Sequence, residues 1–198
     1  MKKNLILASA SPRRREMLEK LGVRMTVRVA GVDESHGEMP PEALVAVLSM
    51  RKADAVFASL TSEEQMRSIL IACDTVVALD GKILEKPCDR EEAAGMLRRL
   101  SGRKHIVCSG LTVKSAEKTV QETVSTEVIF RDLTEDEIAR YVASGEPMDK
   151  AGAYGIQGKA SPFIREIRGD FYTVVGMPLC RLTEILRDSF QYDLLSNL

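Results

Sequence analysis

The sequence contains no tryptophan, and aromatic residues make up only 5% of its 198 residues. Aliphatic side chains must therefore supply most of the hydrophobic core. The 44% hydrophobic content is enough to fill one core of ordinary size. We expect a single domain that spans residues 1–198.

An excess of either charge is also lacking. The chain has 28 Lys and Arg residues against 29 Asp and Glu residues, for a net charge of -1. This near balance argues against a general nucleic-acid binder, which usually carries a strongly basic face. It is compatible with a small anionic ligand held by a few local cations.

The cysteines show no metal-binding pattern. None of them forms a C-x-x-C pair, and the two histidines, His36 and His105, lie far from all of them in sequence. A zinc site is therefore not expected, and we interpret the cysteines as unpaired thiols in a reducing cytosol. They are Cys73, Cys88, Cys108 and Cys180.

Long hydrophobic runs are missing too. A membrane span needs about 20 apolar residues, and Asp74 interrupts the best candidate. The apolar run at Leu5–Ala8 is shorter than the roughly 7 residues of a secretory signal, and Arg13–Arg15 follow at once. We expect a cytoplasmic protein with neither a membrane nor a nucleic acid as partner.

Helical and strand-like segments alternate along most of the chain, which favours an α/β fold around a mixed sheet. The pattern predicts strands at 5–7, 25–29, 69–79 (broken by Asp74), 82–84, 105–113, 119–130 and 171–175. It predicts helices at 12–21, 41–57, 90–100, 134–142 and 178–190, and a glycine-rich loop at 145–162.

The first candidate site is the segment from Ser9 to Arg14, where a strand ends, small residues turn and a helix begins. Backbone N–H groups and the helix dipole favour a phosphate at such a helix start. Ser9 adds a hydroxyl, and Arg13 and Arg14 add guanidinium groups that suit phosphate oxygens. The Walker A pattern is missing. An N-capped helix with Ser11 at the cap and a solvated arginine face is the alternative, and both interpretations stay open.

Asp74 and Thr75 form the second candidate, within the apolar segment 69–79. A carboxylate there is costly to bury unless it is paired or bound to a metal. Charged groups in such places are enriched at functional sites. We favour a functional role for Asp74 over the alternative, in which it ends the strand and caps a loop.

Three more charged residues lie near these segments. Glu34 is in the polar loop after the second strand, Lys52 is on the long helix, and Lys86 follows the predicted hairpin. Each alone is more typical of a solvated surface charge, so they matter only if the fold gathers them.

Glycines are concentrated between Asp149 and Gly158. Such density indicates a backbone that turns sharply or approaches a ligand closely. Gln157, next to Gly158, could place its amide against a ligand. An ordinary turn-rich loop is the alternative.

Together these motifs resemble the Maf family of nucleotide pyrophosphatases. They run in family order from end to end of the chain: Ser9–Arg14, Asp74–Val77 with Lys86-Pro87, Ser109-Gly110 after His105, Asp149–Gly158 and Gly169–Pro178. The resemblance implies a two-lobed α/β domain, built on a mixed twisted sheet with a central cleft. It also implies a cytoplasmic enzyme, a divalent cation such as Mg²⁺ or Mn²⁺, homodimers, and a link to bacterial septum formation.

The resemblance assigns roles residue by residue. Asp74 matches the residue assigned as proton acceptor, and positions tied to substrate choice are matched by Arg13, Thr75 and Gln157. The other matches line the cleft: Ser9, Arg14, Glu34, Lys52 and Lys86. The Ala-Tyr-Gly-Ile-Gln-Gly segment is similar to the branch that acts on dTTP and UTP, not on 7-methyl-GTP. Cys73 departs from the family, which more often has Ala or Gly there, although a thiol is only slightly larger.

The combined interpretation is hydrolysis of dTTP and UTP to the monophosphate and pyrophosphate. Glu34 and Asp74 offer the hard oxygen ligands that Mg²⁺ or Mn²⁺ prefers, and such an ion would bridge phosphate oxygens and help to activate water. One alternative is a non-catalytic nucleotide-binding regulator of septation, although a pure binder has no need of paired carboxylates. Another is a house-cleaning pyrophosphatase for modified purine triphosphates, although Gln157 favours pyrimidines.

Overall fold

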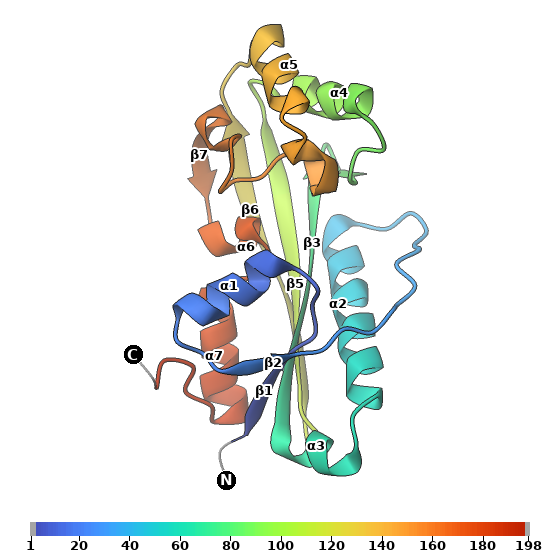
Figure 1. Ribbon diagram of the computed structural model, residues 1–198, viewed down its shortest axis with the longest axis vertical. Coiled ribbons are helices and arrows are strands. Elements are labelled where there is room, and N and C mark those ends of the chain that lie inside the picture. Colours follow the sequence, from blue (N-terminus) through green and yellow to red (C-terminus); the bar gives the residue numbers. More distant parts are fainter. Residues whose placement is uncertain (1–2, 197–198) are drawn as a thin grey trace.

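A mixed β-sheet runs the length of the molecule between layers of helices (Figure 1). The computed structural model describes residues 3–196, and the predicted α/β class is confirmed there. The seven-stranded sheet has the order β2-β1-β3-β5-β6-β7, with β4 paired to β3; β1 is parallel to both neighbours and the other pairs are antiparallel. The strands are β1 (Asn4–Leu7), β2 (Met25–Val27), β3 (Ser68–Leu79), β4 (Lys82–Leu84), β5 (Lys104–Lys114), β6 (Thr119–Phe130) and β7 (Ile164–Arg168).

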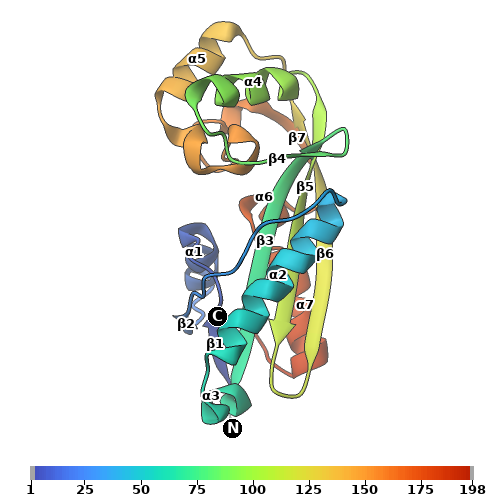
Figure 2. The ribbon, with the colours of Figure 1, turned by 90° about the vertical axis from the view of Figure 1, so that its right-hand side faces the viewer.

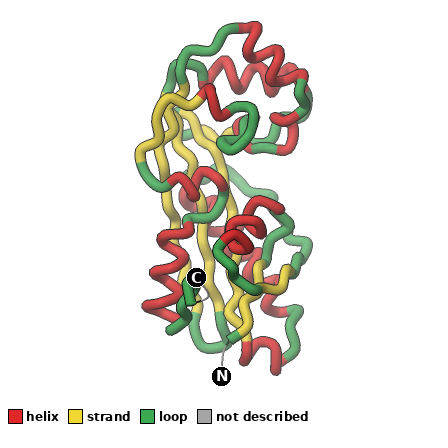
Figure 3. Tube along the Cα trace, turned by 60° about the vertical axis from the view of Figure 1, so that its left-hand side comes forward, coloured by secondary structure: helices red, strands yellow, loops and turns green. Residues whose placement is uncertain are grey.

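The helices gather at two ends of the long strands. The upper lobe in Figure 1 carries α4 (Arg90–Leu100) and α5 (Glu135–Ala143), and the lower lobe carries α1 (Pro12–Lys20), α3 (Ser62–Arg67) and α7 (Leu179–Phe190). Strands β3, β5 and β6 pass through both lobes, as Figure 3 shows from another side. The two-lobed α/β arrangement therefore follows from strands that are longer than either helical layer.

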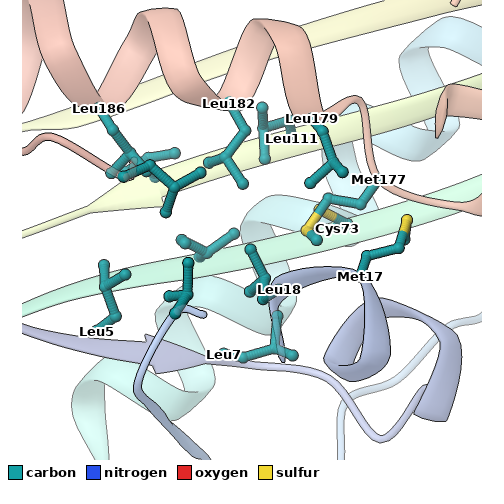
Figure 4. Close-up of a cluster of buried hydrophobic side chains, with 14 of the residues drawn as sticks. Leu5, Leu7, Met17, Leu18, Cys73, Leu111, Met177, Leu179, Leu182 and Leu186 are labelled. Atoms are coloured by element: carbon teal, nitrogen blue, oxygen red, sulfur yellow. The ribbon is translucent and has the colours of Figure 1, made fainter. Parts of the chain in front are cut away.

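Each lobe has its own hydrophobic cluster on one face of the sheet. In the lower lobe, α1 and α7 bury leucines and methionines against β1, β3 and β5 (Figure 4). Fully burying one such side chain stabilises the fold by about 1.5–3 kcal/mol. Cys73 belongs to this cluster, and burial raises the pKa of its thiol to about 11. The upper cluster joins β3, β5 and β6 to α4 and α5 through Val77, Leu97, Phe130 and Ile138.

Helix α2 (Pro41–Ala58) covers the opposite face of β3 and β5 (Figure 2). Leu70 and Ala72 of β3 pack there against Ala53 and Val56 of α2. Successive side chains of a strand point to opposite faces. Asp74 therefore faces α2, whereas its neighbours Cys73 and Thr75 face α1 and α7.

The prediction of a strand at residues 171–175 is wrong, because this segment is the short helix α6 (Phe171–Val175). The run Thr173-Val174-Val175 is rich in β-branched residues, which favour strands. Asp170 overrides that preference as the N-cap: its Oδ2 accepts hydrogen bonds from the backbone N–H of Thr173 at 2.6 Å and from its hydroxyl at 2.7 Å.

Other predictions need smaller corrections. Strand β3 continues without a break through Asp74, which pairs in register with Gly110 of β5, so the alternative of a strand end there is wrong. Strand β7 and helix α3 were not predicted from the sequence. The loop 145–162 contains two short 3₁₀ turns, η1 (Glu146–Asp149) and η2 (Ala151–Ala153), and a third, η3 (Ser161–Phe163), begins at its end. Within residues 3–196, no helix is long and apolar enough to cross a membrane.

Candidate active site

The pairing of β3 leaves a gap along one edge of the strand. β1 pairs with β3 as far as Ile71, and β4 pairs with the same edge only from Val77 onward. In the described part of the chain, no strand covers residues 72–76 on this edge. The segment after β1 and the segment after β4 leave from the two sides of the gap. The segment after β1 contains Ser9 and continues into α1 with Arg13 and Arg14. The segment after β4 contains Lys86.

A lysine and two carboxylates meet beside this gap. The Nζ of Lys52 lies 2.5 Å from Oδ1 of Asp74 and 2.8 Å from Oε1 of Glu34. The Asp74 side chain is only 12% exposed, whereas that of Glu34 is 61% exposed. A buried carboxylate is tolerated when a cation pairs with it, and Lys52 supplies that cation. The fold thus brings together three residues that are widely separated in sequence.

The electrostatic surroundings of Glu34 show which cations face it. The hydrogen bond from Lys52 lowers the pKa of the Glu34 carboxyl more than partial burial raises it, and the charges of Lys52, Lys86 and Arg14 lower it further. Lys86 is exposed and makes no hydrogen bond among the described residues, so its ammonium is free for an anionic ligand. Glu34 is therefore held as a carboxylate among cations from α1, α2 and the segment after β4.

Arg14 is anchored to the protein and is not a solvated surface arginine. Its Nε donates to the carbonyl of Gly176 at 2.8 Å, and its Nη1 donates to the carbonyl of Cys73, also at 2.8 Å. The same Nη1 reaches Ser9 Oγ at 3.2 Å, and Nη2 donates to Thr75 Oγ1 at 3.0 Å. The guanidinium thus joins α1, the open edge of β3 and the end of α6.

Ser9 and Arg13 are placed differently from Arg14. Ser9 is buried, and its hydroxyl oxygen accepts from the backbone N–H of Ser11 and from Arg14, both at 3.2 Å, so its own hydrogen remains for a ligand. Ser11 is at the N-cap position as predicted, although its side chain makes no cap hydrogen bond. Arg13 is half-buried. It faces the loop that contains Asp149, whose pKa is lowered mainly by a hydrogen bond from Lys150 and in smaller part by Arg13.

The glycines of the 149–158 loop make room for two side chains of the same region. A Cβ at Gly158 would lie 2.1 Å from Oε1 of Glu146, and one at Gly155 would lie 2.7 Å from Cε of Lys150. The Glu146 carboxylate in turn accepts two hydrogen bonds of 3.0 Å from the backbone N–H of Lys159. The sequence left open whether these glycines serve a sharp turn or the approach of a ligand. At Gly155 and Gly158 the absence of a side chain makes room for Lys150 and Glu146 of the same region.

Gln157 lies on a loop that contacts both lobes. Tyr154 is buried in the upper cluster, whereas Ile156 is buried in the lower cluster with Met177. Between these anchored residues and Gly158, the Gln157 side chain is exposed, and it makes no hydrogen bond to any residue in the range 3–196. The fold therefore leaves its amide exposed to solvent.

Sequence reasoning gave no individual role to Ser109, Gly176 and Glu146. Ser109 is fully buried and bonds to Thr75, and Gly176 supplies the carbonyl that receives Arg14. Ser109 and Gly176 lie inside motifs that carried the family resemblance, which was the available signal. Glu146 lies outside them and shows its role only in the fold.

The donor set fits a divalent cation that is held together with a phosphate ligand. Among residues 3–196, no group of three or more His, Cys, Asp or Glu side chains could hold a metal by itself. Glu34 and Asp74 already share one cation, the ammonium of Lys52. Mg²⁺ is typically bound through one or two carboxylates plus substrate phosphates, and these two carboxylates match that pattern.

The fold and the site define a two-lobed α/β protein with paired carboxylates and cations at an open edge of its central strand. Residues 4–189 match the family described as Maf-like protein. The chain belongs to the Maf family.

Individual relatives agree over nearly the whole chain. A dTTP/UTP pyrophosphatase from Pelotomaculum thermopropionicum is 47% identical over 196 residues, which cover 98% of this chain and 100% of the relative. Another from Bacillus cytotoxicus is 47% identical over 186 residues, or 93% and 95% of the two chains. A third from Thermus thermophilus is 46% identical over 182 residues, or 92% of each.

Proposed function

We propose that this chain hydrolyses dTTP and UTP to the nucleoside monophosphate and pyrophosphate. The names of its relatives, which match over nearly their full length, support the substrate class. The observation that carries the proposal is the contact of Lys52 with both Glu34 and Asp74 at the gap in the edge of β3. A site that only binds an anion has no need of two carboxylates beside its cations.

Asp74 is the proton acceptor in the proposed reaction. A water molecule attacks the α-phosphorus, its proton passes to the Asp74 carboxylate, and pyrophosphate leaves. Lys52 holds Asp74 by a 2.5 Å hydrogen bond, which keeps the acceptor in one orientation. Such positioned proton transfer typically contributes about 10²–10⁴-fold to a rate.

The remaining residues bind the phosphates. Lys86 and Arg13 lie in the segments that leave the two sides of the gap. In this proposal their charges offset those of the triphosphate, and Ser9 offers a hydroxyl donor. We propose that Glu34 and Asp74 hold Mg²⁺ or Mn²⁺ jointly with the phosphates. When bound, this ion neutralises the charge that develops on the phosphate oxygens.

Gln157 selects the base in this proposal. Thymine and uracil present an N3–H donor flanked by carbonyl acceptors, and a glutamine amide offers a complementary acceptor and donor. The exposed amide of Gln157, on a loop that contacts both lobes, supports this assignment. A homodimer and a cytoplasmic location are further parts of the proposal, and both rest on the family resemblance.

A product assay tests the proposed function. The purified chain is incubated with dTTP, UTP, CTP, ATP and inosine triphosphate, with and without Mg²⁺ or Mn²⁺, and pyrophosphate and orthophosphate are measured separately. We expect metal-dependent pyrophosphate release, fastest from dTTP and UTP. Release of orthophosphate, a preference for inosine triphosphate, or tight binding of dTTP without turnover would each refute the proposal.

Two aspartate variants sharpen this assay. Asp74→Asn keeps the shape of the side chain but removes the proton acceptor, and we expect kcat to fall by about 10²–10⁴-fold. Asp54→Asn is the matched control, because Asp54 also pairs with a lysine at 2.5 Å, in this case Lys114, but on the surface of α2. We expect it to retain the activity of the native chain.

A further inference from the structure

Arg14 has little hydrogen-bonding capacity left for a ligand. A guanidinium carries five N–H donors, and the four hydrogen bonds described above use four of them. Among residues 3–196, one N–H of Arg14, on Nη2, has no partner. The position of this one donor beside the site therefore depends on the protein groups that hold the other four.

Two of these groups, Thr75 and Gly176, connect to the same buried residue, Ser109. The Ser109 hydroxyl donates its single hydrogen to the carbonyl of Thr173 at 2.9 Å. It must then act as acceptor toward Thr75, whose Oγ1 lies 2.8 Å away. The oxygen of Thr75 in turn accepts from Arg14 Nη2. The direction of each bond is thus determined: Arg14 donates to Thr75, and Thr75 donates to Ser109.

A second connection from Ser109 to Arg14 runs through α6. Thr173, whose carbonyl receives the Ser109 hydroxyl, is a fully buried residue of this short helix. The helix ends at Gly176, whose carbonyl accepts from Arg14 Nε. This carbonyl also lies 3.2 Å from Thr75 Oγ1, whose single hydrogen is directed at Ser109. Ser109 therefore restrains Arg14 from two sides, through the Thr75 hydroxyl and through the end of α6.

We propose that Ser109 is a positioning residue, which fixes Arg14 through Thr75 and α6 so that the last free N–H of Arg14 meets the triphosphate. Thr75 acts in the same way, because its only hydroxyl hydrogen is already donated to Ser109. This inference rests on the proposed function. It assigns the influence of Thr75 on substrate use to the placement of Arg14 and not to a hydrogen bond donated to the base.

Kinetics in two backgrounds test this coupling. Ser109→Ala should lower kcat/KM for dTTP by about tenfold or more in the native chain, as expected for weakening a hydrogen-bonded charged group. In a chain that already carries Arg14→Gln, Ser109→Ala should lower kcat/KM for dTTP less than twofold. Thr75→Val, which nearly keeps the shape of threonine, should behave like Ser109→Ala and carries the test if the serine variant does not fold. Thr75→Ser should restore most of the activity.

The matched control is Thr112→Val. Thr112 is also fully buried on β5, and its hydroxyl pairs with that of Ser49 at 3.0 Å on the face opposite to Arg14. This control should lose stability comparable to that lost by Ser109→Ala while keeping native kcat/KM. A loss for Ser109→Ala that is equal in the native and Arg14→Gln backgrounds would overturn the proposal and leave Ser109 with a structural role only.

An NMR measurement separates this inference from the proposed function. The Arg14 Nε–H, which donates to Gly176, should give a slowly exchanging ¹H–¹⁵N signal in the native chain and in Thr112→Val. The signal should exchange faster in Ser109→Ala. An unchanged signal in Ser109→Ala overturns the positioning role even if the chain hydrolyses dTTP. If the native chain releases no pyrophosphate, the proposed function fails, and the NMR result still decides whether Ser109 fixes Arg14.

Discussion

Gly110 lies directly across from Asp74 in the pairing of β3 with β5, and the carbonyl of Val45 on α2 fills the space that a side chain at Gly110 would need. A Cβ at Gly110 would be 2.1 Å from this oxygen. Helix and sheet thus approach closely beside the carboxylate. Lys52, two turns further along α2, lies on the same side of the helix and reaches Asp74.

Gly110→Ala should therefore affect both stability and activity. The added methyl group must push α2 away from the sheet, and such overpacking typically costs about 1–3 kcal/mol. Because α2 carries Lys52, kcat/KM should fall as well. Urea unfolding and steady-state kinetics measure the two effects. Gly95→Ala on α4 is the control, since a Cβ there meets open space, and it should be neutral or stabilising by up to about 1 kcal/mol. Native behaviour of Gly110→Ala in both assays would contradict this explanation.

Glu34→Gln should weaken metal activation. The change removes one of the two carboxylates that are proposed to hold the ion, and an amide is a poorer ligand for Mg²⁺. The Mg²⁺ concentration that gives half-maximal activity should rise at least severalfold, and a Mg²⁺ titration of the rate measures it. Glu38→Gln, which changes another exposed acid of the same loop, should leave the titration unchanged. Identical titrations for the two variants would remove Glu34 from the metal site.

Gln157→Ala should narrow the preference among pyrimidines. A bidentate contact to a base discriminates by about 1–3 kcal/mol, or roughly 5- to 150-fold. The variant should lose kcat/KM for dTTP and UTP while that for CTP changes little, because cytosine lacks the N3–H. Competition assays with mixed substrates measure the ratios directly. Equal losses for all three substrates would show that Gln157 supports the loop and does not contact the base.

Stability at mildly acidic pH should depend on His105. This side chain is 2% exposed, its Nε2 lies 2.8 Å from the Tyr154 hydroxyl, and burial lowers its pKa to about 4. An unfolded histidine binds its proton near pH 6.5. Stability should therefore fall as the pH drops from about 6.5 toward 4, by about 3 kcal/mol in total.

Urea unfolding at several pH values between 7 and 4 measures this loss. His105→Gln should show a flatter pH dependence than the native chain. His36→Gln, which changes the exposed histidine, should keep the native slope. Parallel slopes for the native chain and His105→Gln would show that His105 does not titrate as described.

Periodicity predicted most of the elements because their signals are local. The Asp80-Gly81 turn is an example: both residues have positive φ, at 53° and 76°, as a tight hairpin requires. The prediction of a strand at 171–175 was wrong because the N-cap hydrogen bond to Asp170 outweighed the strand preference of three β-branched residues. Local propensity is a weak prior where a side chain competes for the backbone.

The site was predictable only in part. Asp74 could be found because a carboxylate in an apolar strand is out of place. Its pairing with Lys52, and that of Arg14 with Gly176 across 162 positions, arise only when the strands align. No local pattern distinguishes an arginine held by four protein acceptors from one that faces solvent. The sequence therefore identified the charged residues but not their different surroundings. Arg14 is held by hydrogen bonds to the protein, whereas Lys86 is exposed and makes no hydrogen bond within residues 3–196.

Hydrolysis in water enriched in ¹⁸O shows whether Asp74 activates a water molecule for attack on the α-phosphorus. The products of dTTP hydrolysis are separated after complete turnover, and their ¹⁸O content is measured by mass spectrometry. We expect one ¹⁸O atom in dTMP and none in pyrophosphate, with label uptake slowed by about 10²–10⁴-fold in Asp74→Asn. Label in pyrophosphate, or uptake in Asp74→Asn at the native rate, would contradict this mechanism.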